Sequence, residues 1–159
     1  MIVFEDHDGI KSRYNDEDMV NNHNTICAVI KKDNKYLCQD HVKHNMITFP
    51  VGKVKRGDSI QGTVAIEVGE ETGIKVNDCI KTFTFTKTYD FDGKPITIHC
   101  TVFEVTDWSG TPKNKEPKKH KWVKWLTRKE IEELGKKRKL ADSTIEYFKW
   151  LDGEDIKLK

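Results

Sequence analysis

Three glutamates, Glu67, Glu70 and Glu71, are spaced so that they could act together on one face of a helix. Residues three and four apart in an α-helix lie on the same side of it. Like charges at this spacing destabilise a helix, and the helix dipole disfavours negative charge near a C-terminus. A divalent cation would compensate, because Mg²⁺ prefers carboxylate oxygens and also accepts water and phosphate oxygens. An ordinary solvated acidic surface is the alternative.

The helix that carries these glutamates is predicted over residues 58–72. Its apolar stripe repeats every four residues, at Ile60, Val64 and Val68. Asp58, with Gln61 three residues later, resembles a capping box, and Ser59 is a second candidate for the N-cap. Gly73 suits the left-handed position just past a helix end. The helix is therefore expected to end immediately after its acidic cluster.

A wider pattern surrounds the cluster. From Gly52 the chain runs through five residues to Asp58, then through seven more to Ile66-Glu67-Val68-Gly69-Glu70-Glu71-Thr72-Gly73-Ile74. This pattern resembles the Nudix box: Gly, five residues, Glu, seven residues, then Arg-Glu-hydrophobic-any-Glu-Glu-any-Gly-hydrophobic. Over residues 52–74 the spacing agrees throughout and seven of nine specified positions match. Asp58 replaces the first Glu, and Ile66 replaces the Arg.

The predicted elements indicate a mixed α+β layout for one domain spanning residues 1–159. Strands are expected at residues 24–30, 35–40, 80–89, 95–106 and 121–126. Helices are expected at residues 129–134 and 143–151, the latter with Ile145, Phe148 and Leu151 on its apolar side. Residues 1–23 show no clear period and are interpreted as an edge strand plus loop, or as partly disordered. The Nudix resemblance implies an α/β/α sandwich with a mixed sheet, in which the box forms loop–helix–loop.

The resemblance also implies a reaction and its residues. Members of the family hydrolyse a pyrophosphate bond in a nucleoside diphosphate linked to another moiety. Glu67 and Glu71 would be the principal ligands of Mg²⁺, or of Mn²⁺, with Glu70 binding directly or through water. The Gly52 carbonyl would be a further ligand. One of these glutamates, or an acid from a later loop such as Glu116, would deprotonate the attacking water.

Substrate clues lie outside the box. The candidate phosphate contacts are Lys53, Lys55 and Arg56. Tyr89, 16 residues after Gly73, stands where dinucleoside polyphosphate hydrolases of the family often carry a tyrosine. It slightly favours a dinucleoside polyphosphate or an RNA 5′ end, with a nucleoside triphosphate as a further possible substrate, although a tyrosine in a strand is also ordinary. The basic run Lys136–Lys139 could bind the phosphates of a long substrate, or be a solvated surface.

The two departures from the Nudix pattern change the support of the helix. In the family, the box Arg is commonly paired with box carboxylates, the first Glu among them. Both ends of that pair differ here, and a buried carboxylate without its Arg would be costly. We therefore expect Asp58 to cap the helix and Ile66 to pack in the core, with the three glutamates still able to bind metal. The alternative function is a catalytically weakened Nudix-fold module that binds a nucleotide or regulates a partner.

Composition narrows the other possibilities. A net charge of +2 gives no strong global attraction to nucleic acid. No apolar run is long enough to cross a membrane, and no apolar signal segment follows Met1. The four cysteines form no CxxC pair and are expected to be buried, reduced thiols of a cytoplasmic protein. The histidines His41, His99 and His120 have no ligand-like spacing, so no catalytic role is predicted for them. The sequence does not indicate an oligomeric state.

Overall fold

The computed structural model describes residues 2–5, 11–14, 22–91 and 93–153. The strands are β1 (Ile2–Glu5), β2 (Lys11–Tyr14), β3 (Asn22–Val29), β4 (Lys31–Lys32), β5 (Lys35–His41), β6 (Met46–Thr48), β7 (Val51–Lys53), β8 (Lys75–Phe91), β9 (Lys94–Ser109), β10 (His120–Thr127) and β11 (Lys139–Leu140). The helices are α2 (Ile60–Thr72), α3 (Arg128–Lys137) and α4 (Asp142–Leu151). Within the predicted N-terminal segment, β1 and β2 pair antiparallel, and the rest of residues 1–21 lies outside the described residues.

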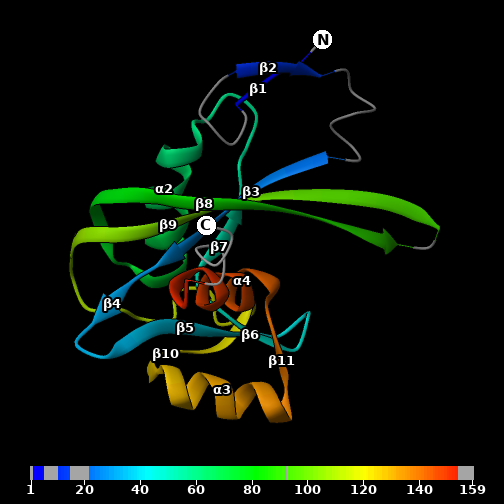
Figure 1. Ribbon diagram of the computed structural model, residues 1–159. Coiled ribbons are helices and arrows are strands. Elements are labelled where there is room, and N and C mark those ends of the chain that lie inside the picture. Colours follow the sequence, from blue (N-terminus) through cyan, green and yellow to red (C-terminus); the bar gives the residue numbers. More distant parts are fainter. Residues whose placement is uncertain (1, 6–10, 15–21, 92, 154–159) are drawn as a thin grey trace.

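Two mixed sheets form the body of the protein. One has the strand order β7-β3-β9-β8, with β3 and β9 parallel and the outer pairs antiparallel. The other has the order β10-β5-β6-β11, with β4 also paired to β5 and with β6 and β11 parallel. Figure 1 shows the long β8–β9 hairpin running across the molecule. The fold is the expected α+β sandwich with a mixed sheet.

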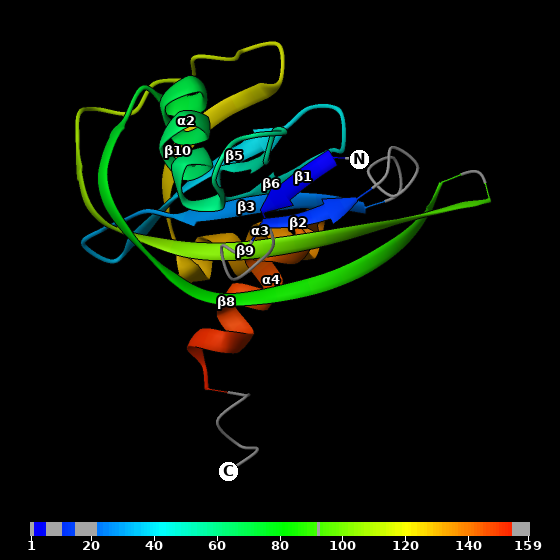
Figure 2. The same ribbon diagram turned by 90° about the horizontal axis from the view of Figure 1, so that it is seen from above.

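Helices α2 and α4 lie on opposite sides of the β3–β9–β8 sheet (Figure 2). Alternation along β3 explains this arrangement, because successive side chains of a strand point to opposite faces. Ile26 and Ala28 pack in one core cluster with Val64 and Val68 of α2. The intervening Cys27 and Val29 pack in a second cluster with Tyr147 and Phe148 of α4. Both faces of β3 are therefore buried, and the sheet separates two cores.

The apolar side of α4 differs from the predicted one. Phe148 is buried as expected, but Ile145 and Leu151 are exposed. The helix instead buries Thr144 and Tyr147 beside Phe148. Ile145 follows Thr144 by about 100° around the helix, which turns it away from the buried face. Leu151 lies on the same side as Tyr147 but is the last residue of α4. The tyrosine remains buried because its hydroxyl donates a 2.7 Å hydrogen bond to Glu104 Oε2.

Candidate active site

Helix α2 is held at both ends by the chemistry of its flanking residues. Its N-cap is Ser59, whose Oγ accepts a 2.9 Å hydrogen bond from the Gly62 backbone N–H. Gly73 ends the helix in the left-handed conformation at φ 77°, and its N–H donates to the Gly69 carbonyl. The predicted C-terminal stop is therefore confirmed. It places Glu67, Glu70 and Glu71 in the last two turns of the helix.

The two expectations for the altered Nudix positions are wrong. Asp58 does not cap the helix, because Ser59 takes that place and the Asp58 backbone N–H closes a turn onto the Lys55 carbonyl. Ile66 does not pack in the core, because 45% of it is exposed. The reason is periodicity: the buried stripe of α2 follows Ile60, Val64 and Val68, and Ile66 falls on another side of the helix.

The loop after β9 docks onto the C-terminal end of α2. The backbone N–H of Lys113 donates to the Thr72 carbonyl at 2.8 Å, and that of Lys115 donates to the Glu71 carbonyl at 3.2 Å. These bonds satisfy carbonyls that a helix end leaves without partners. Asn114 fixes the loop further, because its Nδ2 donates to the His120 carbonyl at 2.7 Å. As a result Glu116, half-buried, lies near the helical glutamates.

Glu67 and Glu71 form a coupled carboxyl pair. Glu71 is only 4% exposed, and burial raises its pKa to about 8, with the charges of Glu67 and Glu116 acting in the same direction. Burial and the charge of Glu70 raise the pKa of Glu67. A hydrogen bond from the protonated Glu71 carboxyl to Glu67 raises the pKa of Glu71 further and lowers that of Glu67, against the effect of burial. Two acids held this close need either a shared proton or a cation between them.

The surroundings of the pair fit a divalent cation in chemistry. Glu67, Glu71 and Glu116 offer only hard oxygen donors, and the Glu67 side chain fills the space beside the backbone of Gly52. Glu70 is exposed at the surface of the helix. Among the side chains that the structure describes, no three acidic, histidine or cysteine groups converge closely enough to chelate an ion in this conformation. The carboxylates of Glu67, Glu71 and Glu116 are therefore near one another, but among the described residues they do not form a closed coordination shell.

Two buried polar residues of the second sheet lie beside Glu71. Gln39 of β5 is fully buried and lowers the pKa of Glu71, yet neither its amide nitrogen nor its oxygen makes a hydrogen bond of normal geometry. His120, at the start of β10, is 3% exposed, and its Nε2 lies 3.9 Å from Glu71 Oε1. Burial lowers the pKa of His120 to about 4, so its imidazole is neutral at physiological pH.

Sequence reasoning missed both residues. His120 is 49 positions from Glu71 and Gln39 is 32 positions before it, so no local spacing relates them. Only the pairing of β10 with β5 and the docking of α2 bring the three side chains together. One weak signal was available. Leu37, Gln39 and His41 alternate along β5, so the apolar face of that strand turns polar toward its end.

The predicted phosphate-binding residues lie in the segment that leads into α2. Lys53, Lys55 and Arg56 are all exposed. Lys55 is close enough to Glu67 for its positive charge to lower the pKa of that carboxyl, against the effect of burial. The structure thus brings Lys55 near the glutamate pair. Lys53 and Arg56 are close to Lys55 in the sequence.

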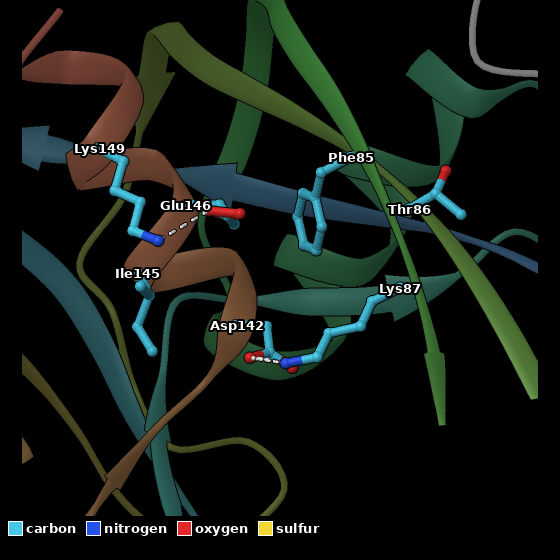
Figure 3. A pocket seen from close by; sticks show the side chains of 7 residues that line it. All are labelled: Phe85, Thr86, Lys87, Asp142, Ile145, Glu146 and Lys149. Carbon is cyan, nitrogen blue, oxygen red and sulfur yellow. Dashed lines mark hydrogen bonds and ion pairs between the residues drawn. The ribbon is translucent and has the colours of Figure 1, made fainter. Parts of the chain in front are cut away.

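Tyr89 is not brought to the glutamates. It shares the alternation of Phe83 and Phe85 along β8, and those rings face the α4 side of the sheet. Its hydroxyl donates to Asp142, the first residue of α4, whose other oxygen accepts from Lys87 Nζ at 2.9 Å. Figure 3 shows Lys87 and Asp142 on facing walls of a pocket of about 280 Å³ between β8 and α4. Tyr89 therefore closes a contact on the face opposite α2.

The basic run Lys136–Lys139 is partly structural. Arg138 forms a two-pronged ion pair with Asp40, a buried carboxylate of β5, and its Nη2 also donates to Asn45 Oδ1 at 2.7 Å. This contact fastens the end of α3 to the second sheet. Lys136 pairs with Glu133 at 3.3 Å on the surface. The arginine is thus not available as a free phosphate contact.

Comparisons with known proteins agree with this geometry. The family model described as NUDIX domain matches residues 21–151. A curated 8-oxo-dGTP diphosphatase of Buchnera aphidicola subsp. Schizaphis graminum is 30% identical over 101 residues, which are 62% of this chain and 73% of that protein. The crystal structure of a MutT NUDIX hydrolase from Burkholderia pseudomallei superimposes with a TM-score of 0.63 at 20% identity, covering 69% of this chain and 85% of that one.

A MutT protein from Methanosarcina mazei Go1 also has a similar crystal structure. It gives a TM-score of 0.63 at 19% identity and covers 84% of this chain and 95% of that one. At these identities the two structures support the fold. Within the described residues, no helix has both the length and the apolar character needed to cross a bilayer.

Proposed function

The chain belongs to the Nudix hydrolase family, and we propose from this premise that it hydrolyses a nucleoside triphosphate at a pyrophosphate bond with the aid of Mg²⁺. Nudix hydrolases use divalent metal ions and act on nucleotide substrates. The observation that carries the proposal is the buried pair Glu67 and Glu71, which Gly52, Lys55 and the Glu116 loop surround.

Glu67 and Glu71 would hold the cation, with the Gly52 carbonyl as a further ligand and Glu70 binding directly or through water. Mn²⁺ would serve in place of Mg²⁺, because both ions accept oxygen ligands. When bound, such an ion neutralises phosphate charge and lowers the pKa of a bound water. The protein's own part is to keep two carboxylates together where burial alone disfavours their charge.

The remaining charged residues divide the other tasks. Glu70 and Glu116 lie outside the buried pair, so either could accept a proton from the attacking water. The Glu116 carboxylate lies 3.5 Å from Lys119 Nζ, on the loop that docks against α2. Lys53, Lys55 and Arg56 are exposed at the entrance to the helix and would contact the phosphate chain.

The substrate class follows from two observations. The curated relative at 30% identity is an 8-oxo-dGTP diphosphatase, which supports a nucleoside triphosphate, modified or not. Tyr89, which favoured a dinucleoside polyphosphate or an RNA 5′ end, has its hydroxyl engaged by Asp142 on the far face of the sheet. The position of Tyr89 thus gives those longer substrates no support. Its role in substrate binding stays a prediction.

A substrate panel tests this assignment. The protein would be incubated with dGTP, 8-oxo-dGTP, the other nucleoside triphosphates, diadenosine polyphosphates and 5′-triphosphorylated RNA, each with Mg²⁺ or Mn²⁺. The expected result is cation-dependent conversion of a nucleoside triphosphate to the monophosphate and pyrophosphate. Preferential turnover of RNA, with a steep loss of rate as the salt concentration rises, would instead identify an RNA 5′ end as the substrate.

The second candidate is a Nudix fold with weakened catalysis that binds nucleotides. Ile66, exposed where the family carries its arginine, motivates it, because an isoleucine cannot brace a box carboxylate. Tight binding of nucleoside triphosphate without turnover of any panel member, under either cation, would favour this candidate. A variant that restores the pattern, Ile66→Arg together with Asp58→Glu, would then gain activity.

We also propose a cytoplasmic location. The four cysteines Cys27, Cys38, Cys79 and Cys100 are free and buried. Burial raises the pKa of each thiol, which leaves them protonated and unreactive. Free buried thiols are typical of proteins kept in a reducing compartment. Fractionation of cells with an antibody against the protein would test this location.

A further inference from the structure

We propose that Gln39 and His120 are positioning residues that hold the Glu71 carboxylate for the cation. The proposal rests on the proposed function, because it assumes that Glu71 binds a divalent ion. Neither residue belongs to the Nudix pattern, and each comes from the second sheet and not from the box.

Gln39 is the first part of this arrangement. Strand β5 lies between β10 and β6, and Gln39 pairs with Val123 on one side and Thr48 on the other. Its side chain is fully buried, and both of its polar atoms lack a normal hydrogen-bond partner. An unpartnered buried amide destabilises the fold, so such a group points to a missing partner. The carboxylate of Glu71 is the charged group beside it.

His120 is the second part. Its Nε2 faces Glu71 Oε1 at 3.9 Å, and its Nδ1 is buried without a partner. This separation exceeds a hydrogen bond, but contacts of this kind in a ligand-free site often tighten when the ligand binds. The backbone holds the ring in place from two sides. The His120 N–H donates to the Glu116 carbonyl at 2.9 Å, and the His120 carbonyl accepts from Asn114.

A second histidine supports His120. The ring of His41 packs edge-on against His120 with centroids 5.5 Å apart, and it stacks on His44 at 4.9 Å. His41 Nδ1 accepts from the His44 backbone N–H, which orients its ring. Backbone hydrogen bonds and the neighbouring ring therefore hold the imidazole of His120 in place. A residue that directs its Nε2 at Glu71 needs such support.

The chemical consequence concerns the direction of Glu71. A carboxylate has two oxygens, and a ligand oxygen binds a cation best when the other oxygen accepts hydrogen bonds that fix the plane of the group. Gln39 and the Nε2 of His120 can donate such bonds from within the protein. Outer partners of this kind typically change metal affinity by about 10–100-fold when they are removed.

Two polar substitutions of His120 provide the test. The amide nitrogen of a glutamine can occupy the place of Nε2, whereas an asparagine reaches only as far as Nδ1. We would measure Mn²⁺ binding by calorimetry, without substrate, for the parent, His120→Gln, His120→Asn and Glu71→Gln. His44→Phe is the matched control, because it keeps a ring on His41 at an exposed position. Thermal unfolding would establish that each variant is folded.

The proposal expects His120→Asn to weaken Mn²⁺ binding by about 10–100-fold and His120→Gln by about 3-fold or less. Parent-like affinity in His120→Asn, with affinity lost in Glu71→Gln, would overturn it and leave the proposed function standing. Equal losses in His120→Gln and His120→Asn would also overturn it, since the reach of the donor would not matter. Parent-like affinity in Glu71→Gln would mean that Glu71 does not hold the cation, and the proposed function would fail as well.

Gln39→Leu gives an independent test that does not depend on the histidine variants. It removes two buried, unpartnered polar atoms at nearly constant volume, so the metal-free protein should unfold at an equal or higher temperature. If Gln39 positions Glu71, Mn²⁺ affinity should nevertheless fall by about 10-fold. A purely structural residue would not combine unchanged or raised stability with weaker binding. Unchanged affinity in Gln39→Leu would remove this residue from the proposal.

Discussion

A β-carbon added to Gly52 would lie 2.1 Å from the Cγ of Glu67 and 2.2 Å from its Cδ. Real β-carbons essentially never approach other heavy atoms more closely than 3.0 Å. The Glu67 side chain therefore occupies the volume that any other residue at position 52 would need. The absence of a side chain at Gly52 therefore lets the Glu67 carboxylate of α2 lie directly beside the backbone of strand β7.

Gly52→Ala should lower kcat/KM by about 100-fold or more, because the Glu67 carboxylate must shift, and misplacement by about 1 Å can cost that much. Steady-state kinetics with Mg²⁺ would measure the loss. Gly69→Ala is the matched control within α2. There an added β-carbon would find its nearest atom, the Ile74 carbonyl oxygen, at 3.8 Å. This variant should unfold at a higher temperature, by up to about 1 kcal/mol of stability, and retain its activity. Parent-like kinetics in Gly52→Ala would show that the Glu67 side chain can move aside and still place its carboxylate for catalysis.

The metal-free protein should lose stability as pH rises above neutrality. The folded-state pKa of Glu71, about 8, is above its unfolded value of 4.5, so the native state binds the proton more tightly. Its contribution is complete below pH 4.5 and is lost as pH rises toward 8. His120 acts oppositely, but only between about pH 4 and 6.5.

Between pH 6.5 and 8 only Glu71 of these two residues titrates. The free energy of unfolding of the parent should therefore fall by roughly 2 kcal/mol over this range. Urea unfolding in a chelator would measure this loss. In Glu71→Gln the fall should largely disappear, because no buried acid titrates at that position. Glu67, whose pKa is raised as well, leaves a smaller slope of the same sign. A parent whose stability is flat or rises across this window would contradict the assignment of a protonated Glu71.

Arg138→Ala should destabilise the fold by about 3 kcal/mol, because it leaves the buried carboxylate of Asp40 without its ion pair. Chemical denaturation would measure the change. Lys137→Ala, at an exposed neighbouring position, should change stability by less than about 0.5 kcal/mol. If the two variants are equally stable, the basic run is a solvated surface throughout and its arginine has no structural role.

Tyr89→Phe should cost about 1 kcal/mol of stability through loss of the hydrogen bond to Asp142. Because this contact is on the α4 side of the sheet, the KM for nucleoside triphosphates should not change. Measuring KM for a triphosphate and for a diadenosine polyphosphate in the same variant decides its role. A selective rise in KM for the dinucleotide would restore Tyr89 as a substrate contact.

The sequence was sufficient where local spacing decides the outcome. The acidic cluster, its helix and the Gly73 stop depend on contacts within one or two turns, and all were predictable. The prediction of a buried Ile66 is wrong because the loss of an ionic partner does not by itself place a side chain in the core, whereas helical periodicity places Ile66 outside the buried stripe.

What could not be predicted depends on contacts between distant segments. Gln39 and His120 meet Glu71 only through strand pairing and the docking of a loop onto α2. The direction in which Tyr89 points depends on the register of β8, which contains irregularities between Val76 and Phe83. A one-residue shift reverses the face of every later side chain, so sequence alone could not assign that tyrosine to a side of the sheet.

The central claim is that the paired carboxylates of Glu67 and Glu71 hold the cation on which hydrolysis depends. It is tested most directly by the rate of dGTP hydrolysis against Mg²⁺ concentration for the parent, Glu67→Gln and Glu71→Gln. We expect a parent rate that vanishes in chelator, and variants that remain folded but are slower by about 100-fold or more at saturating Mg²⁺. Folded variants that hydrolyse dGTP as fast as the parent would show that the cation is held elsewhere.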